Sequence, residues 1–454
     1  MRLFIPLLLL VLWMQRSMAM DTLAREGDTA VKSCYCAIPL APTTTFDSKH
    51  TYYSLSPLMT ETYTANSLQL DIDFHSNSNA IPTTFAGAFL SGGTITDEIK
   101  NRCLSYTTGA IKYEDELKAG IAYKHYFGSS GFGLYASYYH RNIRTLYTTH
   151  DAFKLMFYGN KPFEGTTADL SDIRFENLMY NQYAIGVSKA LGHFFVGLNI
   201  SFLQGFSNLQ VNNTQGSLYT APFGEYLDMS YNLVINQSNV NSTKFFDLNG
   251  SGFAADLQLV YHNAKSRFSF TVSDLGSIAW NKNTANYTGD TSFRYEGINV
   301  GDITNLTGNG LRGINLDSIA ALLGPKKSNR AYTTTLPTTF QVTYAHLFQL
   351  RKSSMILTFG INTRLLHNYY AYGYIKTSFL LRHDWTTAVS IGAGGYSLCN
   401  VGIDVGKTWR NFDFIIGTAN LVGSILPMYY PGSSAYLRLG FHFADIHHAA
   451  PIAR

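Results

Sequence analysis

The chain has 454 residues, of which only 14% are charged, and its 34 basic and 30 acidic residues give a formal net charge of +4. This charged fraction is well below the roughly 25% of an average soluble protein, and there is no basic cluster, so the composition argues against a nucleic-acid-binding protein. The chain is also rich in aromatic residues, with 31 Tyr and 30 Phe. Abundant tyrosine with little charge is typical of side chains at a lipid–water boundary, although a large soluble β-sandwich has a similar composition.

The N-terminus has the layout of a secretory signal peptide. Arg2 is followed by an apolar run from Leu3 to Trp13, and Ser17-Met18-Ala19 then provides small residues for a cleavage site. We expect residues 1–19 to be cleaved after Ala19 and the mature chain to be exported. The apolar run is too short to span a bilayer as a helix, so an uncleaved membrane anchor is the less favoured alternative.

Residues 20–66 are irregular, and we predict that they form a plug or a periplasmic segment. Strict alternation begins at residue 67, where Leu68, Leu70 and Ile72 alternate with polar residues. This period of two is typical of a β-strand with two different faces. The pattern recurs at residues 196–202, 268–273, 340–345, 375–382, 401–406 and 437–443.

The polar faces of these strands decide between a barrel and a sandwich. They hold mainly Gly, Ser, Thr and Asn with few charges, which suits a wet lumen better than the charged outer face of a soluble sandwich. No later apolar stretch is long enough for a helical span. The sequence therefore predicts an all-β fold, an antiparallel transmembrane β-barrel over residues 67–443 with a C-terminal tail at 444–454. We expect about 14 strands, within a range of roughly 12 to 16.

The connections between strands are predicted to be asymmetric. Short turns at 191–193 and 264–266 contrast with longer segments at about 145–179, 207–251 and 276–336. Periplasmic turns and external loops of a barrel differ in this way. We predict three short helices in the connections, starting near Thr96, Asp151 and Asn315, that serve in loop packing or as a luminal plug or gate.

Seven charged or titratable residues are candidates for the luminal face: Asp71, Asp73, Lys376, Arg382, Asp404, Arg438 and His442. Facing an open pore, they would tune ion selectivity, as rings of charge do. Alternatively they pair across the lumen and brace the wall, because a buried charge is costly unless it is paired. We favour bracing.

Other chemistry is weakly supported by the sequence. Cys34, Cys36, Cys103 and Cys399 are expected to be inert thiols or to form one structural disulfide, in which Cys103 pairs with Cys34 or Cys36. The G-x-G-x-x-G at residues 308–313 lacks a preceding strand and is interpreted as a loop that ends in a helix. His447-His448 has no further ligand for a metal, and no G-x-S-x-G elbow of a hydrolase is present. We expect no catalytic residues, no cofactor and no metal.

Two stretches carry a family resemblance: FKLMFYGN at residues 153–160, and VSDLGSIAWN at 272–281 with FRYEG at 293–297. They resemble an uncharacterised family of Bacteroidota outer-membrane barrels, a domain of unknown function, which is similar in build to the FadL-type long-chain fatty-acid transporters. The resemblance covers nearly the whole mature chain and implies a barrel of about 14 strands with an N-terminal plug. FadL-like members carry Asn-Pro-Ala near the start of the domain, whereas this chain has Leu55-Ser56-Pro57-Leu58. The resemblance assigns no catalytic residues.

These patterns predict a porin-like protein of the cell outer membrane. We expect a channel or transporter for small or hydrophobic or amphipathic solutes, surrounded by outer-membrane lipid. A non-conducting factor that docks other outer-membrane or periplasmic proteins, such as a secretion shuttle, is the first alternative. A barrel hydrolase is the second.

Overall fold

A computed structural model of the chain describes residues 64–127, 130–240, 247–263, 265–296, 326–350, 354–409 and 412–445. The chain divides into two compact units, Met1–Cys36 and Ala37–Arg454, and all described residues belong to the second. Several predictions fall outside these residues: the signal peptide at 1–19, most of the plug at 20–66, the helix near Asn315, the glycine-rich motif at 308–313, and most of the tail at 444–454. At the two borders the strands extend beyond the predicted barrel, since the first strand begins at Thr64 and the last ends at Asp445.

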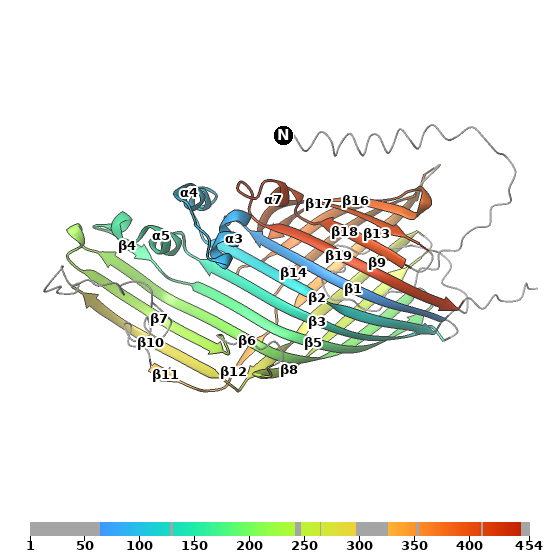
Figure 1. The fold of residues 1–454 in the computed structure, drawn as a ribbon, viewed down its shortest axis with the longest axis horizontal. Helices are drawn as coiled ribbons and strands as arrows, with labels where there is room; N and C mark the ends of the chain where they lie inside the picture. Colours follow the sequence, from blue (N-terminus) through green and yellow to red (C-terminus); the bar gives the residue numbers. More distant parts are fainter. Residues whose placement is uncertain are drawn as a thin grey trace, which may run out of the picture. The chain divides into compact units, whose positions relative to one another are not determined.

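The main body of the fold is a closed antiparallel β-barrel of 14 strands (Figure 1). In ring order the strands are β1 (Thr64–Ser78), β2 (Ile111–Phe127), β3 (Phe132–Thr148), β5 (Ile173–Leu191), β6 (Phe194–Thr220), β8 (Gly250–His262), β9 (Ser266–Trp280), β13 (Thr339–Gln349), β14 (Ser354–Arg364), β15 (Tyr370–Leu380), β16 (Trp385–Gly395), β17 (Ser397–Thr408), β18 (Phe412–Thr418) and β19 (Ser433–Asp445). The ring closes because β1 pairs with both β2 and β19. The predicted fold class and strand number are confirmed.

The long connections are more ordered than the sequence suggested. The 27 residues of β6 first pair with β8 and then, from Asn208 onward, with β7 (Leu227–Ser238). β7 pairs in turn with β10 (Thr284–Tyr295), so a second sheet continues from one side of the barrel (Figure 1). The short strands β4 (Thr167–Asp169), β11 (Lys326–Ser328) and β12 (Tyr332–Thr335) complete the described pairings.

Amide side chains explain why this second sheet is not irregular. Asn236 Nδ2 donates to Gln210 Oε1 (3.2 Å), and Asn286 Nδ2 donates to Asn236 Oδ1 (2.9 Å), so one amide row crosses β6, β7 and β10. Cross-strand pairs of this kind are the unit of sheet stabilisation. The cross-strand register places these amides opposite one another on one face.

Helices α4 (Asp97–Ser105) and α5 (His150–Tyr158) form where the sequence predicted them. Their caps are the reason, since Thr96 accepts from the N–H of Ile99 and Thr149 accepts from the N–H of Ala152. Helix α3 (Thr83–Ser91) was missed because its N-cap, Pro82, has no capping side chain. In the part of the chain that the structure describes, short α7 (Leu421–Ile425) and the 3₁₀ turns η1 (Lys161–Phe163), η2 (Pro222–Gly224) and η4 (Arg382–Asp384) are the remaining helical elements. Within the described ranges, no helix combines the length and apolarity needed to cross a membrane.

The two faces of the barrel wall have opposite character. On β1, Leu70 and Ile72 are exposed, while Asp71 and Asp73, which alternate with them, are buried. Every barrel strand carries at least one exposed large apolar side chain: Leu70, Ile121, Leu134, Ile185, Ile200, Leu259, Phe268, Val342, Ile361, Ile375, Val389, Val405, Ile416 and Phe441. A soluble sandwich would bury these side chains, so the alternation here places the apolar face outside and the polar face inside.

Aromatic rings form rows at two levels of the outer wall. Near the short turns, Phe194 on β6 contacts Tyr261 on β8, with ring centroids 5.2 Å apart. Farther along the same strands, Phe202 on β6 contacts Phe253 on β8 (5.8 Å). A contact between Phe202 and Tyr183 (6.4 Å) extends the second row to β5. The exposed apolar band on these strands therefore has an aromatic boundary at each end.

Candidate functional site

The interior of the barrel holds the charged groups of the candidate site. Of the seven predicted residues, Asp71, Asp73, Lys376 and Asp404 are buried on the inner face, and the side chain of Arg438 is 15% exposed. Arg382 was expected within a strand but lies in η4, because β15 ends at Leu380. The structure does not describe the side chains of Arg382 and His442.

The inner-face charges that the structure describes include two close ion pairs. Arg438 Nε lies 2.8 Å from Asp71 Oδ1, which joins β19 to β1. Lys376 Nζ lies 2.8 Å from Asp404 Oδ2, which joins β15 to β17 across β16. Asp71 also accepts a hydrogen bond from Tyr139 on β3 (2.7 Å). Each carboxylate is therefore held by groups from other strands.

A larger set of charges, which sequence analysis missed, crosses the interior. Arg141 on β3 donates to Glu116 Oε1 on β2 through Nη2 (2.6 Å) and to Asp274 Oδ1 on β9 through Nη1 (2.6 Å). Arg364 on β14 donates to Glu114 Oε2 (3.2 Å) and to Glu116 Oε2 (2.9 Å). We call these five residues the transverse network: Glu114, Glu116, Arg141, Asp274 and Arg364.

The transverse network spans the barrel because its strands are far apart in the ring. β2 and β14 lie opposite each other in the strand order, and Glu116 is shared between the arginines of β3 and β14. All five side chains are at most 6% exposed. Charges removed from water in this way persist only when they are paired and hydrogen-bonded, so the network acts as a tie across the lumen.

A local irregularity in β9 brings Asp274 into the network. The β8–β9 register shifts between Ala255 and Leu257, and Asp274 has a positive φ of 59°. A bulge of this kind re-aims a side chain that regular alternation would send elsewhere. Asp256 on β8 accepts the backbone N–H of Asp274 (2.8 Å), and Thr338 Oγ1 donates to the carbonyl of Asp274 (3.0 Å).

An apolar cluster lies beside the charges within the barrel. It contains Ile143, Leu178, Tyr180, Leu203, Ala254, Ile278, Trp280 and Leu336. The Trp280 ring packs against Gly205 and Gly250, where any side chain would overlap it, and its Nε1 donates to Thr334 Oγ1 (3.2 Å). The interior therefore offers apolar and charged surfaces next to each other.

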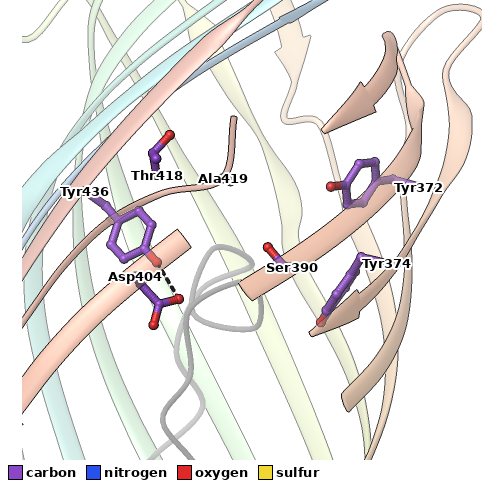
Figure 2. A pocket seen from close by; sticks show the side chains of 7 residues that line it. All are labelled: Tyr372, Tyr374, Ser390, Asp404, Thr418, Ala419 and Tyr436. Carbon is purple, nitrogen blue, oxygen red and sulfur yellow. Dashed lines mark hydrogen bonds between the residues drawn. The ribbon is translucent and has the colours of Figure 1, made fainter. Parts of the chain in front are cut away.

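A small cavity lies on the opposite arc of the inner wall. It is lined by Tyr372, Tyr374, Ser390, Asp404, Thr418, Ala419 and Tyr436, and the space that a water-sized molecule can enter is about 10 Å³, enough for about one water (Figure 2). Tyr436 donates to Asp404 Oδ2 (2.9 Å), the same oxygen that Lys376 contacts. Hydroxyl groups and tyrosine rings dominate this lining.

The loop between β14 and β15 is tied to the far side of the barrel. His367 Nε2 lies 2.7 Å from Asp172 Oδ2, and its ring packs edge-on against Tyr147 with centroids 4.6 Å apart. Arg174 Nε also contacts Asp172 (2.8 Å). Burial opposes ionisation of Asp172, but hydrogen bonds from Arg174 and His367 outweigh it and lower the pKa of this carboxyl.

Catalytic and metal sites find little support in this part of the chain. Among the described residues, no group of three or more His, Cys, Asp or Glu side chains is arranged to hold a metal ion. His346 contacts Ser266 Oγ (2.8 Å), but its other polar partner is the Tyr344 hydroxyl (3.4 Å) rather than a carboxylate. A Ser–His pair without an orienting acid does not make a hydrolytic triad.

Comparison with known proteins identifies the family of the chain. Residues 66–419 match the family described as "Family of unknown function (DUF5723)". The chain belongs to DUF5723. The predicted resemblance to an uncharacterised barrel family is thereby confirmed. No curated protein matches the sequence.

Several solved structures are similar to this DUF5723 chain. The toluene transporter TbuX of Ralstonia pickettii has 11% identity and a TM-score of 0.37, covering 86% of this chain and 92% of its own. The toluene transporter TodX of Pseudomonas putida has 8% identity and a TM-score of 0.39, and the match covers 89% of this chain and 94% of TodX. A FadL homologue of Pseudomonas aeruginosa has 10% identity and a TM-score of 0.37, and the match covers 87% of this chain and 93% of the homologue. Similarity at this level leaves the role of this chain to be argued from its own residues.

One cysteine of the DUF5723 domain gives a direct test of how helix α4 packs. Cys103 on α4 is a free, fully buried thiol, and burial raises its pKa to about 12. Because the thiolate is the reactive form, we expect iodoacetamide to modify native Cys103 far more slowly than the partly exposed Cys399. Peptide mass spectrometry after labelling measures the extent of modification of each cysteine. Resistance of Cys103 that survives denaturation and disappears with reductant would instead reveal a disulfide to Cys34 or Cys36.

Proposed function

We propose that this chain is an outer-membrane channel or transporter whose lumen passes a small amphipathic solute. One observation carries the proposal: every barrel strand exposes apolar side chains on its outer face, while charged and amide side chains are buried on the inner face. A bilayer core offers no water to backbone polar groups, and a closed barrel has no unpaired edge. We further propose that residues 1–19 are cleaved on export and that the segment from residue 20 up to the start of β1 at Thr64 acts as a plug.

The aromatic rows support a position in the membrane. Phe194 and Phe202 are eight residues apart on β6. Eight residues of strand extend about 26 Å, which becomes about 20 Å along the barrel axis at a tilt of about 40°. Aromatic girdles flank the apolar band of outer-membrane barrels at a similar separation. The second sheet, formed by β7 and β10, would then lie outside the bilayer.

The transverse network supports a closed but openable lumen. Arg141 connects β3 to Asp274 on β9 and Arg364 connects β14 to Glu116 on β2, so displacement of either arginine would remove one of the connections across the lumen. An amphipathic solute has two parts that suit this interior: an apolar part for the cluster around Trp280, and a polar part that exchanges with the charged groups. Paired charges that can change partners are a common basis of gating.

A second candidate function is supported by a separate feature. On helices α3 and α5 the side chains of Phe89, Leu90 and Met156 are 54%, 49% and 70% exposed. Contiguous exposed apolar groups mark interaction sites, so a non-conducting factor that docks another protein is the rival.

Conductance in planar bilayers, with uptake of a fluorescent fatty acid into proteoliposomes, tests the proposal. We expect the full mature chain to pass ions or the fatty acid weakly and a chain without residues 21–63, which keeps β1 whole, to pass one of them more readily. Empty bilayers are the control. Absence of both activities in both forms would overturn the channel and favour the docking factor.

A further inference from the structure

Helices α3 and α5 pack against the outside of the barrel wall. Phe85 on α3 and Phe153 on α5 belong to one buried cluster with Tyr113, near the start of β2. The next residues along β2 that face the lumen are Glu114 and Glu116, so alternation turns Tyr113 outward. Both helices are therefore anchored on the outer wall, at the end of the barrel with the long connections (Figure 1).

The height of α3 can be compared with the apolar band on the same strand. The exposed side chains of Phe127 and Leu117 are ten residues apart on β2. Ten residues of strand extend about 33 Å, or about 25 Å along the barrel axis at a tilt of about 40°, which is the height of the apolar band of outer-membrane barrels. Tyr113, which α3 contacts, lies four residues beyond Leu117, or about 10 Å higher. Because a helix has a radius of about 5 Å, α3 lies at the upper edge of the band.

No unpaired charge separates α3 from the band on β2. Asp115, which lies between Leu117 and Tyr113 in the sequence, is buried, and its Oδ1 is 2.9 Å from Arg144 Nε. The Tyr113 hydroxyl donates to the other oxygen of this carboxylate (2.7 Å). The chain from Ser76 to Thr96, which contains α3, has no charged residue. The apolar surface therefore continues from the wall to the helix.

The free faces of the two helices are apolar as well. Phe89 and Leu90 on α3 and Met156 on α5 are exposed, and the ring of Phe89 contacts that of Phe157 on α5 with centroids 6.4 Å apart. A helix that is apolar on its packed face and on its free face needs a cover on both. A protein partner would be expected to meet a polar rim around such a patch, whereas lipid requires only apolar groups.

We infer that α3 and α5 bind the membrane surface, with Phe89, Leu90 and Met156 inserted into the lipid leaflet at this end of the barrel. Helices that lie in the interface bury their apolar face about 5–10 Å into the boundary between headgroups and acyl chains. The same side chains support the docking factor considered above, and lipid is the occupant that their position beside the band favours. The inference rests on the proposed function, since it requires the barrel wall to lie in a bilayer.

Tryptophan fluorescence of the full mature protein in phosphatidylcholine vesicles tests the inference. The signal that Leu90→Trp adds to the wild type is measured with lipids brominated near the headgroup end or near the methyl end of the acyl chains, and with iodide in the water. We expect bromine near the headgroups to quench this added signal more than deep bromine, and iodide to quench it little. Met156→Trp repeats the measurement in case Leu90→Trp does not fold.

Two variants serve as matched controls for depth. Leu198→Trp lies between the aromatic rows on β6, so deep bromine should quench its added signal most. Phe223→Trp replaces a 92% exposed side chain in η2, so iodide alone should quench its added signal.

The outcomes separate this inference from the proposed function. If bromine quenches Leu198→Trp but neither Leu90→Trp nor Met156→Trp, lipid contact by the helices is overturned and the barrel stays in the membrane. Shielding of Leu90→Trp and Met156→Trp from bromine and iodide alike would show that a second copy of the chain covers this face, and would overturn the inference as well. Absence of bromine quenching in Leu198→Trp would contradict the membrane location itself, and with it the inference.

Discussion

Replacing Arg141 by Met is expected to destabilise the barrel and raise its conductance. The change leaves Glu116 and Asp274, which are 1% and 0% exposed, without their shared cation. Removing one partner from a buried ion pair costs about 3–5 kcal/mol of unfolding free energy, because the remaining charge stays out of water. The interior loses its connection from β3 to β9, so ions should pass more readily. Heat-induced unfolding in detergent and single-channel recording measure the two effects.

Two variants control this prediction. Arg102→Met removes a more exposed ion pair on α4, between Arg102 Nη2 and Glu98 Oε1 at 3.1 Å, and should change stability by less than about 1 kcal/mol. Glu116→Gln combined with Arg141→Met and Asp274→Asn removes the uncompensated charges and should recover much of the lost stability. Unchanged stability and conductance in Arg141→Met would show that the transverse network does not tie the lumen.

Replacing Leu198 by Arg is expected to impair insertion and stability in a membrane. Leu198 is 43% exposed and lies midway between Phe194 and Phe202 on β6. An arginine at the lipid-facing midplane of a barrel costs about 2–4 kcal/mol. In a protein whose outer face met water, the same exposed substitution would stay within about 0.5 kcal/mol. Urea titration of the folded fraction in lipid vesicles distinguishes a lipid-facing from a water-facing Leu198.

Phe223→Arg is the matched control for Leu198→Arg. Phe223 is 92% exposed in η2, at the end of β6 farthest from the aromatic rows. If the apolar band alone contacts lipid, this second arginine should be tolerated. Equal tolerance of both arginines would contradict the lipid-facing assignment.

The fold was largely predictable because one short-range pattern determines it. The alternation of Leu68, Leu70 and Ile72 with polar residues fixes which face of β1 points outward, and closure then follows for a chain whose strands repeat this pattern. Helix α4 was predictable from its cap Thr96, since capping is local, whereas α5 was predicted to start at Asp151 without its actual cap, Thr149. The length of β6 was not predictable from the sequence, because amide partners on β7 stabilise its outer half and no local pattern reveals them.

The candidate site was only partly predictable. Asp71, Lys376, Asp404 and Arg438 each carry a charge on the polar face of an alternating strand and could be selected for that reason. The transverse network could not be predicted, since Arg141 and Asp274 are 133 positions apart and meet only after the ring closes. Asp274 in addition depends on a bulge, and the charged run from Glu114 to Glu116 resembles a solvated strand end.

The most direct test of the whole account is the behaviour of the mature chain in water without detergent. A barrel whose polar side chains line the lumen exposes the apolar outer faces of all fourteen strands. These faces must be covered by lipid or detergent. We predict that analytical ultracentrifugation finds a folded monomer only when detergent is present, and that the chain aggregates when the detergent is removed. A detergent-free monomer that unfolds cooperatively like a globular protein would contradict the account.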